Sequence, residues 1–192
     1  MKTGTLLRGA VAVLAITLAT TVASAQALNS GAQTIALNAN LAESITLTLS
    51  ANAVNFTLSA GSAANAGSTA ITATTAWTLK PGRTTVGVYA YFASAAAALT
   101  DGAGNNIPSS AFSIADNGGA ATALTATVPA GGGFGGANAG LQLANVAITG
   151  ANKSSSRTDA MAFNINLTGG TLPQLPAATY TGTLNIQAQA TP

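Results

Sequence analysis

The chain of 192 residues contains no cysteine and no histidine, and it carries few charges. The missing residue types exclude disulfides, thiolate and imidazole catalysis, and ordinary zinc or copper sites. Charged residues make up 5% of the chain, whereas an ordinary globular protein has about 25%. We therefore expect a protein that is not an enzyme and that uses no cofactor and no metal.

The few carboxylates form no recognisable catalytic motif. They are far apart in the sequence, whereas a glycosidase needs two facing carboxyl groups; they are Glu43, Asp101, Asp116 and Asp159. The stretch 101–106 is rich in oxygen ligands but has one carboxylate, which predicts a turn more than a calcium loop. Residues 131–136 have the glycines of a phosphate-binding loop without its lysine or its helix, and they predict a flexible loop.

The first 25 residues have the pattern of a cleaved secretory signal peptide. Lys2 and Arg8 precede an apolar run of about 13 residues, and Ala23-Ser24-Ala25 is a small-residue cleavage site. The run is shorter than the roughly 20 residues that span a bilayer, and we expect no transmembrane segment after the leader. Without the leader, four basic residues balance four acidic ones, so nucleic-acid binding lacks its electrostatic basis. The predicted location is exported: periplasm, outer surface or extracellular.

Apolar and polar residues alternate through most of the remaining chain, which is typical of strands with one buried face. No stretch after the leader has helical periodicity. The alternation predicts strands at 33–41, 44–50, 54–58, 69–79, 84–92, 111–114, 122–128, 141–148, 161–167 and 179–190. Eight to ten short strands separated by Gly, Asn and Pro turns indicate an antiparallel β-sandwich. An immunoglobulin-like sandwich is our choice, with a jelly roll as the alternative.

Three local features refine this expectation. Residues 69–92 predict a hairpin, because Lys80-Pro-Gly-Arg83 suits a type II turn between two strands. A change of parity between Leu143 and Val146 predicts a β-bulge near Asn145. The polar run 150–159 predicts a loop.

The last predicted strand is the longest, at about twelve residues. Tyr180, Gly182, Leu184 and Ile186 share one face with two further alanines, and threonine, asparagine and glutamine occupy the other face. This segment resembles the closing strand of spore coat protein U-like and related bacterial pilin-like domains, whose motif is Pro-Ala-Gly-Thr-Tyr. Pro176, Ala177, Thr179 and Tyr180 match that motif, and Ala178 stands where it has glycine.

The resemblance implies an incomplete immunoglobulin-like sandwich that is exported and assembled into a surface fibre, pilus or coat. A neighbour's N-terminal extension would supply the missing strand, by strand addition to an open edge. Residues 26–41 would be that extension and 42–192 a single domain. Ile35, Leu37, Ala39 and Leu41 have the alternation of a donor strand. The alternative is that 33–41 is the domain's own first strand. The implied partners are a second copy or a related subunit, and a periplasmic chaperone.

A second hypothesis is a stand-alone exported binding module for a polysaccharide or a protein. Tyr89 and Tyr91 share a face of their strand, where exposed rings could stack on sugars. The glycine-rich loop, which contains residues 131–136, could contribute to the same binding site. The same tyrosines could equally pack within the sandwich. The fibre-subunit hypothesis predicts self-association, whereas the binding module predicts a closed monomer.

Overall fold

The structure is a computed structural model that describes residues 28–192, so the predicted signal peptide at 1–25 lies outside the described part. Residues Asn40–Pro192 form a compact unit. Every strand pair in it is antiparallel, which confirms the all-β prediction. The strands are β1 (Ser44–Leu49), β2 (Asn65–Ala66), β3 (Ile71–Thr78), β4 (Thr85–Tyr91), β5 (Leu99–Thr100), β6 (Asn106–Ile107), β7 (Phe112–Asp116), β8 (Thr122–Ala123), β9 (Gly140–Ala147), β10 (Ser154–Ile165) and β11 (Asn185–Thr191).

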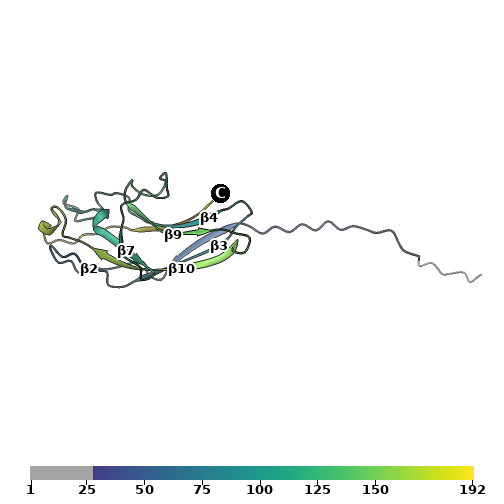
Figure 1. Ribbon diagram of the computed structural model, residues 1–192, viewed down its shortest axis with the longest axis horizontal. Helices are drawn as coiled ribbons and strands as arrows, with labels where there is room; N and C mark the ends of the chain where they lie inside the picture. The colour runs from purple at the N-terminus through teal and green to yellow at the C-terminus, as the bar shows by residue number, and fades with distance from the viewer. Residues whose placement is uncertain (1–27) are drawn as a thin grey trace, which may run out of the picture. The chain divides into compact units, whose positions relative to one another are not determined.

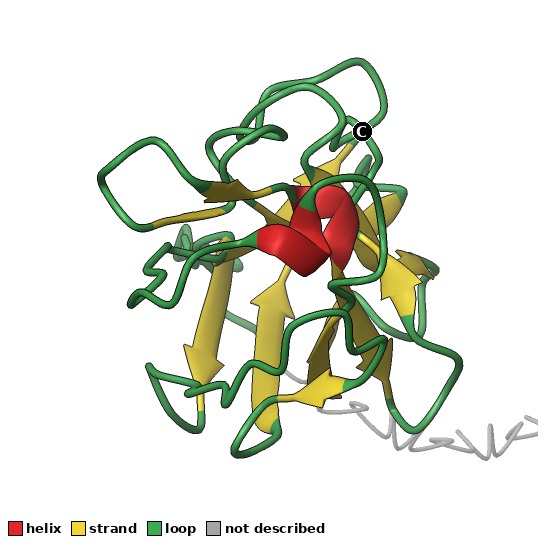
Figure 2. Ribbon diagram, turned by 90° about the vertical axis from the view of Figure 1, so that its left-hand side faces the viewer, coloured by secondary structure: helices red, strands yellow, loops and turns green. Residues whose placement is uncertain are grey.

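The strands form two main sheets that lie in separate layers, with β4 and β9 in one and β3, β7 and β10 in the other (Figure 1). The larger sheet has the order β1-β3-β10-β7-β8, with β2 paired to β10. The smaller sheet has the order β11-β4-β9, and β5 pairs with β6 in a separate ribbon. Two short 3₁₀ turns, η1 (Ser109–Ala111) and η2 (Leu172–Gln174), are the helical segments in Figure 2.

The core lies between the two sheets, and the alternation of the strands determines it. In β3 every second residue from Ile71 to Trp77 is buried, and β10 buries Asp159, Met161, Phe163 and Ile165 in the same way. The smaller sheet contributes Val86, Val88 and Ala90, which are fully buried. Side chains from both sheets therefore interdigitate, as in a β-sandwich.

The predicted hairpin at 69–92 is wrong, because its two strands belong to different sheets. β3 pairs with β1 and β10, whereas β4 pairs with β9 and β11. The turn between them does form: the Arg83 amide donates to the Lys80 carbonyl, and Gly82 has a positive φ of 101°. It is a corner that carries the chain across the sandwich, so Trp77 and Val86 face each other in one apolar cluster.

Other predictions need smaller corrections. The predicted loop at 150–159 is wrong, because β10 begins at Ser154. The predicted bulge is confirmed: Val88 pairs with Ala144 and Tyr89 with Gln142, which leaves Leu143 as the extra residue.

Three predicted strands form fewer backbone pairs with neighbouring strands than their alternation indicates. Residues 33–41 contain no strand, and 54–58 contain one isolated bridge, from Phe56 to Gly67. The final strand is regular over Asn185–Thr191 only, so its predicted first half, 179–184, is irregular. The last two of these segments border the groove described next.

Candidate functional site

An apolar groove opens between the two sheets on the side where each of them ends. One wall is formed by residues 49–58, which follow β1, and the other by residues 177–186, which lead into β11. The cavity between the walls has a volume of about 750 Å³. Interiors of proteins are close-packed with few voids larger than a water molecule. An opening of this size beside the core is therefore the candidate binding site of the domain.

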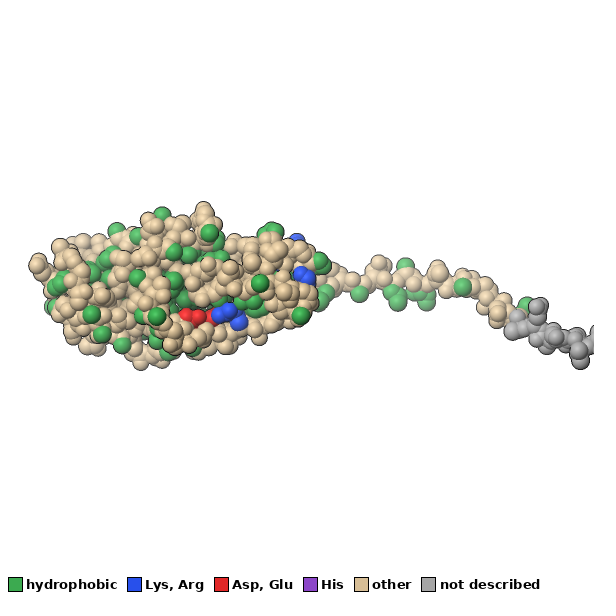
Figure 3. Space-filling view, viewed as in Figure 1, with side chains coloured by type: hydrophobic (Ala, Val, Ile, Leu, Met, Phe, Trp, Pro, Cys, Tyr) green, Lys and Arg blue, Asp and Glu red, His purple; other side chains and the backbone are tan. Residues whose placement is uncertain are grey.

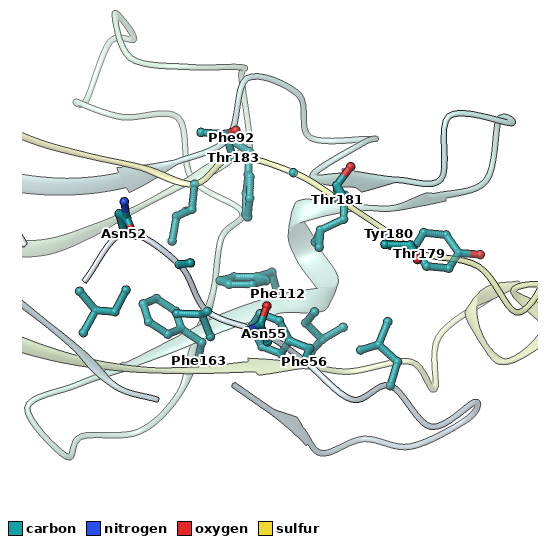
Figure 4. Close-up of a pocket in the computed structure, with 18 of the residues that line it drawn as sticks. Asn52, Asn55, Phe56, Phe92, Phe112, Phe163, Thr179, Tyr180, Thr181 and Thr183 are labelled. Atoms are coloured by element: carbon teal, nitrogen blue, oxygen red, sulfur yellow. The ribbon is translucent and has the colours of Figure 1, made fainter. Parts of the chain in front are cut away.

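The floor of the groove is the aromatic centre of the core. The Phe112 ring lies 5.7 Å from Phe56 and 5.2 Å from Phe92, both edge to face, and 5.9 Å from Phe163. Figure 4 shows Phe112 in the middle of the groove, with Thr179, Tyr180, Thr181 and Thr183 on the opposite side from Phe56 and Phe163. Ile71, Met161 and Ile165 complete the floor. An occupant would therefore meet apolar side chains on the floor and both apolar and polar side chains, such as Asn55 and Thr181, on the walls.

The backbone on the two walls is hydrogen-bonded on the sides that face away from the groove. The Ser68 amide donates to the Asn55 carbonyl at 2.8 Å, which ties the first wall to the segment that contains β2. Thr181 and Thr100 exchange two backbone hydrogen bonds of 2.9 Å, which tie the second wall to the β5–β6 ribbon. Within the described residues, β11 pairs with β4 along one edge and with no strand along the other. β11 lines the groove at Ile186 only, and β1 and β11 contact each other across the sandwich.

The C-terminal motif predicted from the sequence forms the second wall. Thr179, Tyr180, Gly182, Leu184 and Ile186 all line the groove. The Tyr180 hydroxyl donates to the Pro176 carbonyl at 3.0 Å, so that Pro176 positions the ring without lining the cavity. Desolvation, together with the charge of Asp101, raises the pKa of the Tyr180 hydroxyl above its ordinary value.

Gly182 is required at its position because a Cβ there would collide with the carbonyl oxygen of Ala98. Leu184 and Ile186 are only half-buried although they pack against the main core cluster. The sequence predicts a core strand here, and the structure leaves its apolar face partly uncovered.

The predicted donor residues are exposed. Ile35, Leu37 and Leu41 have exposed fractions of 84%, 90% and 84%, and Ala39 is exposed as well. Within residues 28–43 no regular secondary structure is present. Four apolar side chains at alternate positions therefore lack partners in the described part of the chain.

The two tyrosines of the binding-module hypothesis are covered by the glycine-rich loop. Phe134 stacks on Tyr91 with ring centroids 5.6 Å apart, and it meets Tyr89 edge to face at 5.6 Å. Tyr89 is 7% exposed, and the Tyr91 hydroxyl donates to Gln187 at 2.8 Å. Gly135 permits this arrangement, since a Cβ there would meet Tyr91 and the Phe92 carbonyl. Tyr89 is therefore buried, and Phe134 covers one face of the half-exposed Tyr91.

Two carboxylates that are distant in the sequence come together beside β10. Asn117 donates to both Asp116 and Asp159, and Arg157 forms an ion pair with the fully buried Asp159. Figure 3 shows acidic and basic side chains side by side on one face, further basic side chains at the right-hand end of the domain, and few other charges on the surface in view. Burial and the negative charge of Asp159 raise the pKa of Asp116. Neither carboxylate lines the groove, and the arginine occupies the place beside Asp159.

The remaining carboxylates have structural partners. Asp101 accepts hydrogen bonds from the amides of Ala103 and Asn105 and from the Asn105 side chain, which confirms the predicted turn and lowers the pKa of Asp101. Glu43 pairs with Arg83 and Lys80. Within residues 28–192 no group of three metal-ligating side chains of the His, Cys, Asp or Glu type is found.

The sequence does not identify the first wall of the groove. Val54, Phe56 and Leu58 alternate and predict an ordinary strand. The signal that marks them as a wall is the absence of a pairing partner, which sequence periodicity does not show.

Comparison with protein-family models, with curated proteins and with solved structures finds no match for this chain. In the described part of the chain, no helix has the length and hydropathy needed to cross a bilayer. The groove and the exposed N-terminal segment are therefore the features of the molecule that indicate a function.

Proposed function

We propose that the protein is a non-enzymatic, exported structural subunit of a bacterial surface fibre, pilus or coat that assembles by strand complementation. Residues 33–41 of one copy lie in the groove of the next copy. The observation that carries the proposal is the coexistence of an unfilled apolar groove of about 750 Å³ with an exposed segment of alternating apolar residues.

The groove and the segment match in length and chemistry. The first wall, 49–58, has ten residues and the segment has nine, so at about 3.3 Å per residue each extends roughly 30 Å. Ile35, Leu37, Ala39 and Leu41 would point toward the aromatic floor, and the uncharged Thr34, Asn38 and Asn40 would point toward water. Burial of a large aliphatic side chain contributes about 1.5–3 kcal/mol, so three such residues and an alanine supply a substantial driving force.

The backbone that leads into β11 would supply the polar half of the interaction. A segment placed beside residues 183–186 would form main-chain hydrogen bonds with them, as in other cases of strand addition. The sandwich so completed is of the immunoglobulin-like kind. The near-zero net charge after the leader does little to oppose association between copies. Export rests on the sequence pattern of residues 1–25.

Cysteine trapping tests this proposal, because the chain has no cysteine of its own. A copy with Leu37→Cys is mixed with a copy with Leu184→Cys, and the disulfide-linked heterodimer is measured on a non-reducing gel. The expected result is efficient cross-linking, since both side chains lie in the same groove. The matched control is Ala36→Cys, whose side chain has the opposite parity and points out of the groove. Equal cross-linking by Leu37→Cys and Ala36→Cys would contradict the proposal.

The binding-module hypothesis is not favoured by the structure of its own site. Tyr89 is buried beneath Phe134, and Tyr91 is stacked on the same ring. A stable monomer that shows no cross-linking in the cysteine experiment would bring this hypothesis back.

A further inference from the structure

We propose that the outer face of the larger sheet is a second self-association surface, through which the domains of neighbouring fibres pack face to face. This contact rests on the proposed function, because it needs copies arranged in a row and the fibre supplies them. The partner is a second copy of this chain, and the surface is separate from the groove, which lies on the other side of the same sheet.

The outer face is built from the neighbouring strands β1, β3 and β10. It consists of the even-numbered residues of 44–48, 72–78 and 154–158, because the odd-numbered residues of these strands are on the core side. It is the side of the layer that is turned away from β4 and β9 (Figure 1). Nine of the ten residues are serine or threonine, with Ala76 as the exception, and we call them the hydroxyl face. Those of β1 and β10 are exposed, and those of the central strand β3 are half-buried.

The register of the strands arranges the hydroxyl face in rows. Thr48, Thr74 and Thr158 are paired with one another across the three strands, and two further rows of three repeat this arrangement toward Ser44. Strands in a sheet lie about 4.8 Å apart, and alternate residues along one strand lie about 6.6 Å apart. The face is therefore a regular array of short side chains.

The hydroxyl face carries no charge. Of the eight charged side chains that follow the leader, Arg157 and Asp159 belong to β10 but are on its core side. Glu43, Lys80 and Lys153 lie just beyond the ends of the strands, all at the same end of the face. In a face-to-face pair whose strands run in opposite directions, these charged ends are at opposite ends of the contact. Like charges are then not placed together, which would oppose the pairing.

Two chemical properties make the hydroxyl face complementary to a second copy of itself. An interface between two identical patches must be self-complementary. A hydroxyl group both donates and accepts hydrogen bonds, so the hydroxyls of two facing sheets can pair with each other. All ten side chains are short, which lets two sheets stack at the usual separation of about 10 Å, with the threonine methyl groups in contact between them.

A neutral polysaccharide is the other uncharged partner that is rich in hydroxyl groups. Stacking on a sugar ring requires an aromatic side chain, and the hydroxyl face has none. Trp77 is on the core side of β3, and Tyr89 and Tyr91 belong to the smaller sheet. The second copy is therefore the partner that this face fits better.

The area of the hydroxyl face determines the strength of the contact. At the spacings of a sheet each residue covers about 32 Å², so that ten residues cover about 320 Å². A stable complex of standard size buries about 800 Å² on each partner, and two separate domains would therefore bind each other weakly. Copies aligned along two fibres bind through many such contacts at once, and linked contacts raise the overall affinity by about 10²–10⁴-fold.

Charge placed on the hydroxyl face tests the proposal in fibres of residues 26–192. Thr48→Lys/Thr158→Lys puts two lysines in one row of the face, and the control Gln142→Lys/Asn145→Lys puts two lysines at exposed positions of β9 in the smaller sheet. Electron microscopy and low-speed sedimentation are carried out at low ionic strength, where charges are least screened, and thermal unfolding checks that the variants are folded. We expect bundled fibres from the parent and the control, and single fibres from the face variant. Equal bundling of all three proteins, or single fibres from the parent, would overturn the proposal.

A bead assay separates this outcome from that of the proposed function. Beads are coated with the chain through a flexible C-terminal linker, in the background Ile35→Asn/Leu37→Asn, which disables strand complementation and leaves the hydroxyl face intact. We expect these beads to cluster, and to lose clustering when Thr48→Lys/Thr158→Lys is added. Dispersed beads would overturn the proposed face even where fibres form, and dispersed beads that bind insoluble cellulose would assign the face to a polysaccharide. Clustered beads together with a parent that forms no fibres would refute the proposed function alone.

Discussion

Asp116 and Asp101 show how the surroundings of a carboxylate decide its contribution to stability. Burial and the nearby charge of Asp159 raise the pKa of Asp116. Its ionised form is therefore disfavoured in the folded state, and this destabilisation develops as the pH rises from the unfolded pKa through the folded pKa. Hydrogen bonds from Asn105 and the turn amides lower the pKa of Asp101. Its contribution is stabilising above the unfolded pKa and is lost as the pH falls through the folded pKa.

The variant Asp116→Asn should therefore raise the melting temperature at pH 7 and have a smaller effect at pH 3, where the carboxyl of the parent is mostly protonated. Asp101→Asn should do the opposite and lower the melting temperature at pH 7 more than at pH 3. Thermal unfolding of both variants at the two pH values checks the signs. Parallel shifts of the two variants at pH 7 would contradict these environments.

Phe112 connects three other rings in the floor of the groove, at centroid distances of 5.2–5.9 Å. Phe112→Ala should cost about 3–5 kcal/mol, the usual loss for a buried phenylalanine. At about 2–4 °C per kcal/mol, the melting temperature should fall by roughly 10 °C. Phe112→Leu, which keeps most of the volume, serves as the control and should lose much less. An equally small loss for both variants would mean that the ring cluster does not support the core.

At the scale of elements, the glycine-rich loop owes its fold to a few close contacts. Gly135 has a φ of 64°, and a Cβ there would collide with Tyr91 and with the Phe92 carbonyl. Gly131 has a φ of 96° but open space around it. Both positions share the left-handed conformation, so an alanine in either one pays a similar strain of about 1–2 kcal/mol.

Gly135→Ala should cost about 1–3 kcal/mol more than Gly131→Ala, because it adds overpacking to the strain. It should also release Phe134 from the two tyrosines, which we expect to see as faster proteolysis of residues 129–140 and altered tyrosine fluorescence. Equal stability and equal cleavage of the two variants would argue that the loop is not anchored through Phe134.

The sequence predicts elements well where one face is buried and fails where the answer depends on a distant partner. Alternation in 71–78 and 161–165 indicates strands because these residues lie in the middle of a sheet. The proposed hairpin at 69–92 fails because a good turn at 80–83 is compatible with either one sheet or a corner between two. The serines at 154–156 have no strand pattern of their own, and pairing with β3 makes them part of β10.

The sequence predicts one part of the candidate site and misses the other part, because the missed part depends on distant pairing partners. The closing motif around Tyr180 and the alternation at 33–41 are visible in the sequence. The groove is a property of two segments that do not pair with each other, 49–58 and 177–186, and no local pattern shows that a neighbour is missing. The meeting of Asp116 with Asp159, which lie 43 residues apart, is likewise a consequence of the pairing of β7 with β10.

At the scale of the whole molecule, the proposed function gives the open groove and the exposed segment complementary roles. Stability of the domain and association of its copies are then linked, since a partner that binds only the folded state stabilises it. The melting temperature should therefore rise with protein concentration. A melting temperature that is independent of concentration would indicate a domain that is complete without a neighbour.

The most direct measurement of the central claim is the size of particles formed by residues 26–192, by light scattering and negative-stain electron microscopy, compared with two matched variants. Ile35→Asn/Leu37→Asn removes apolar side chains from the inward face, which forfeits about 3–6 kcal/mol of burial. Thr34→Asn/Ala36→Asn changes the opposite face of the same segment. We predict fibres from the parent and from the outward-face variant, and none from the inward-face variant. Fibres from all three proteins, or a monomeric parent, would contradict the account.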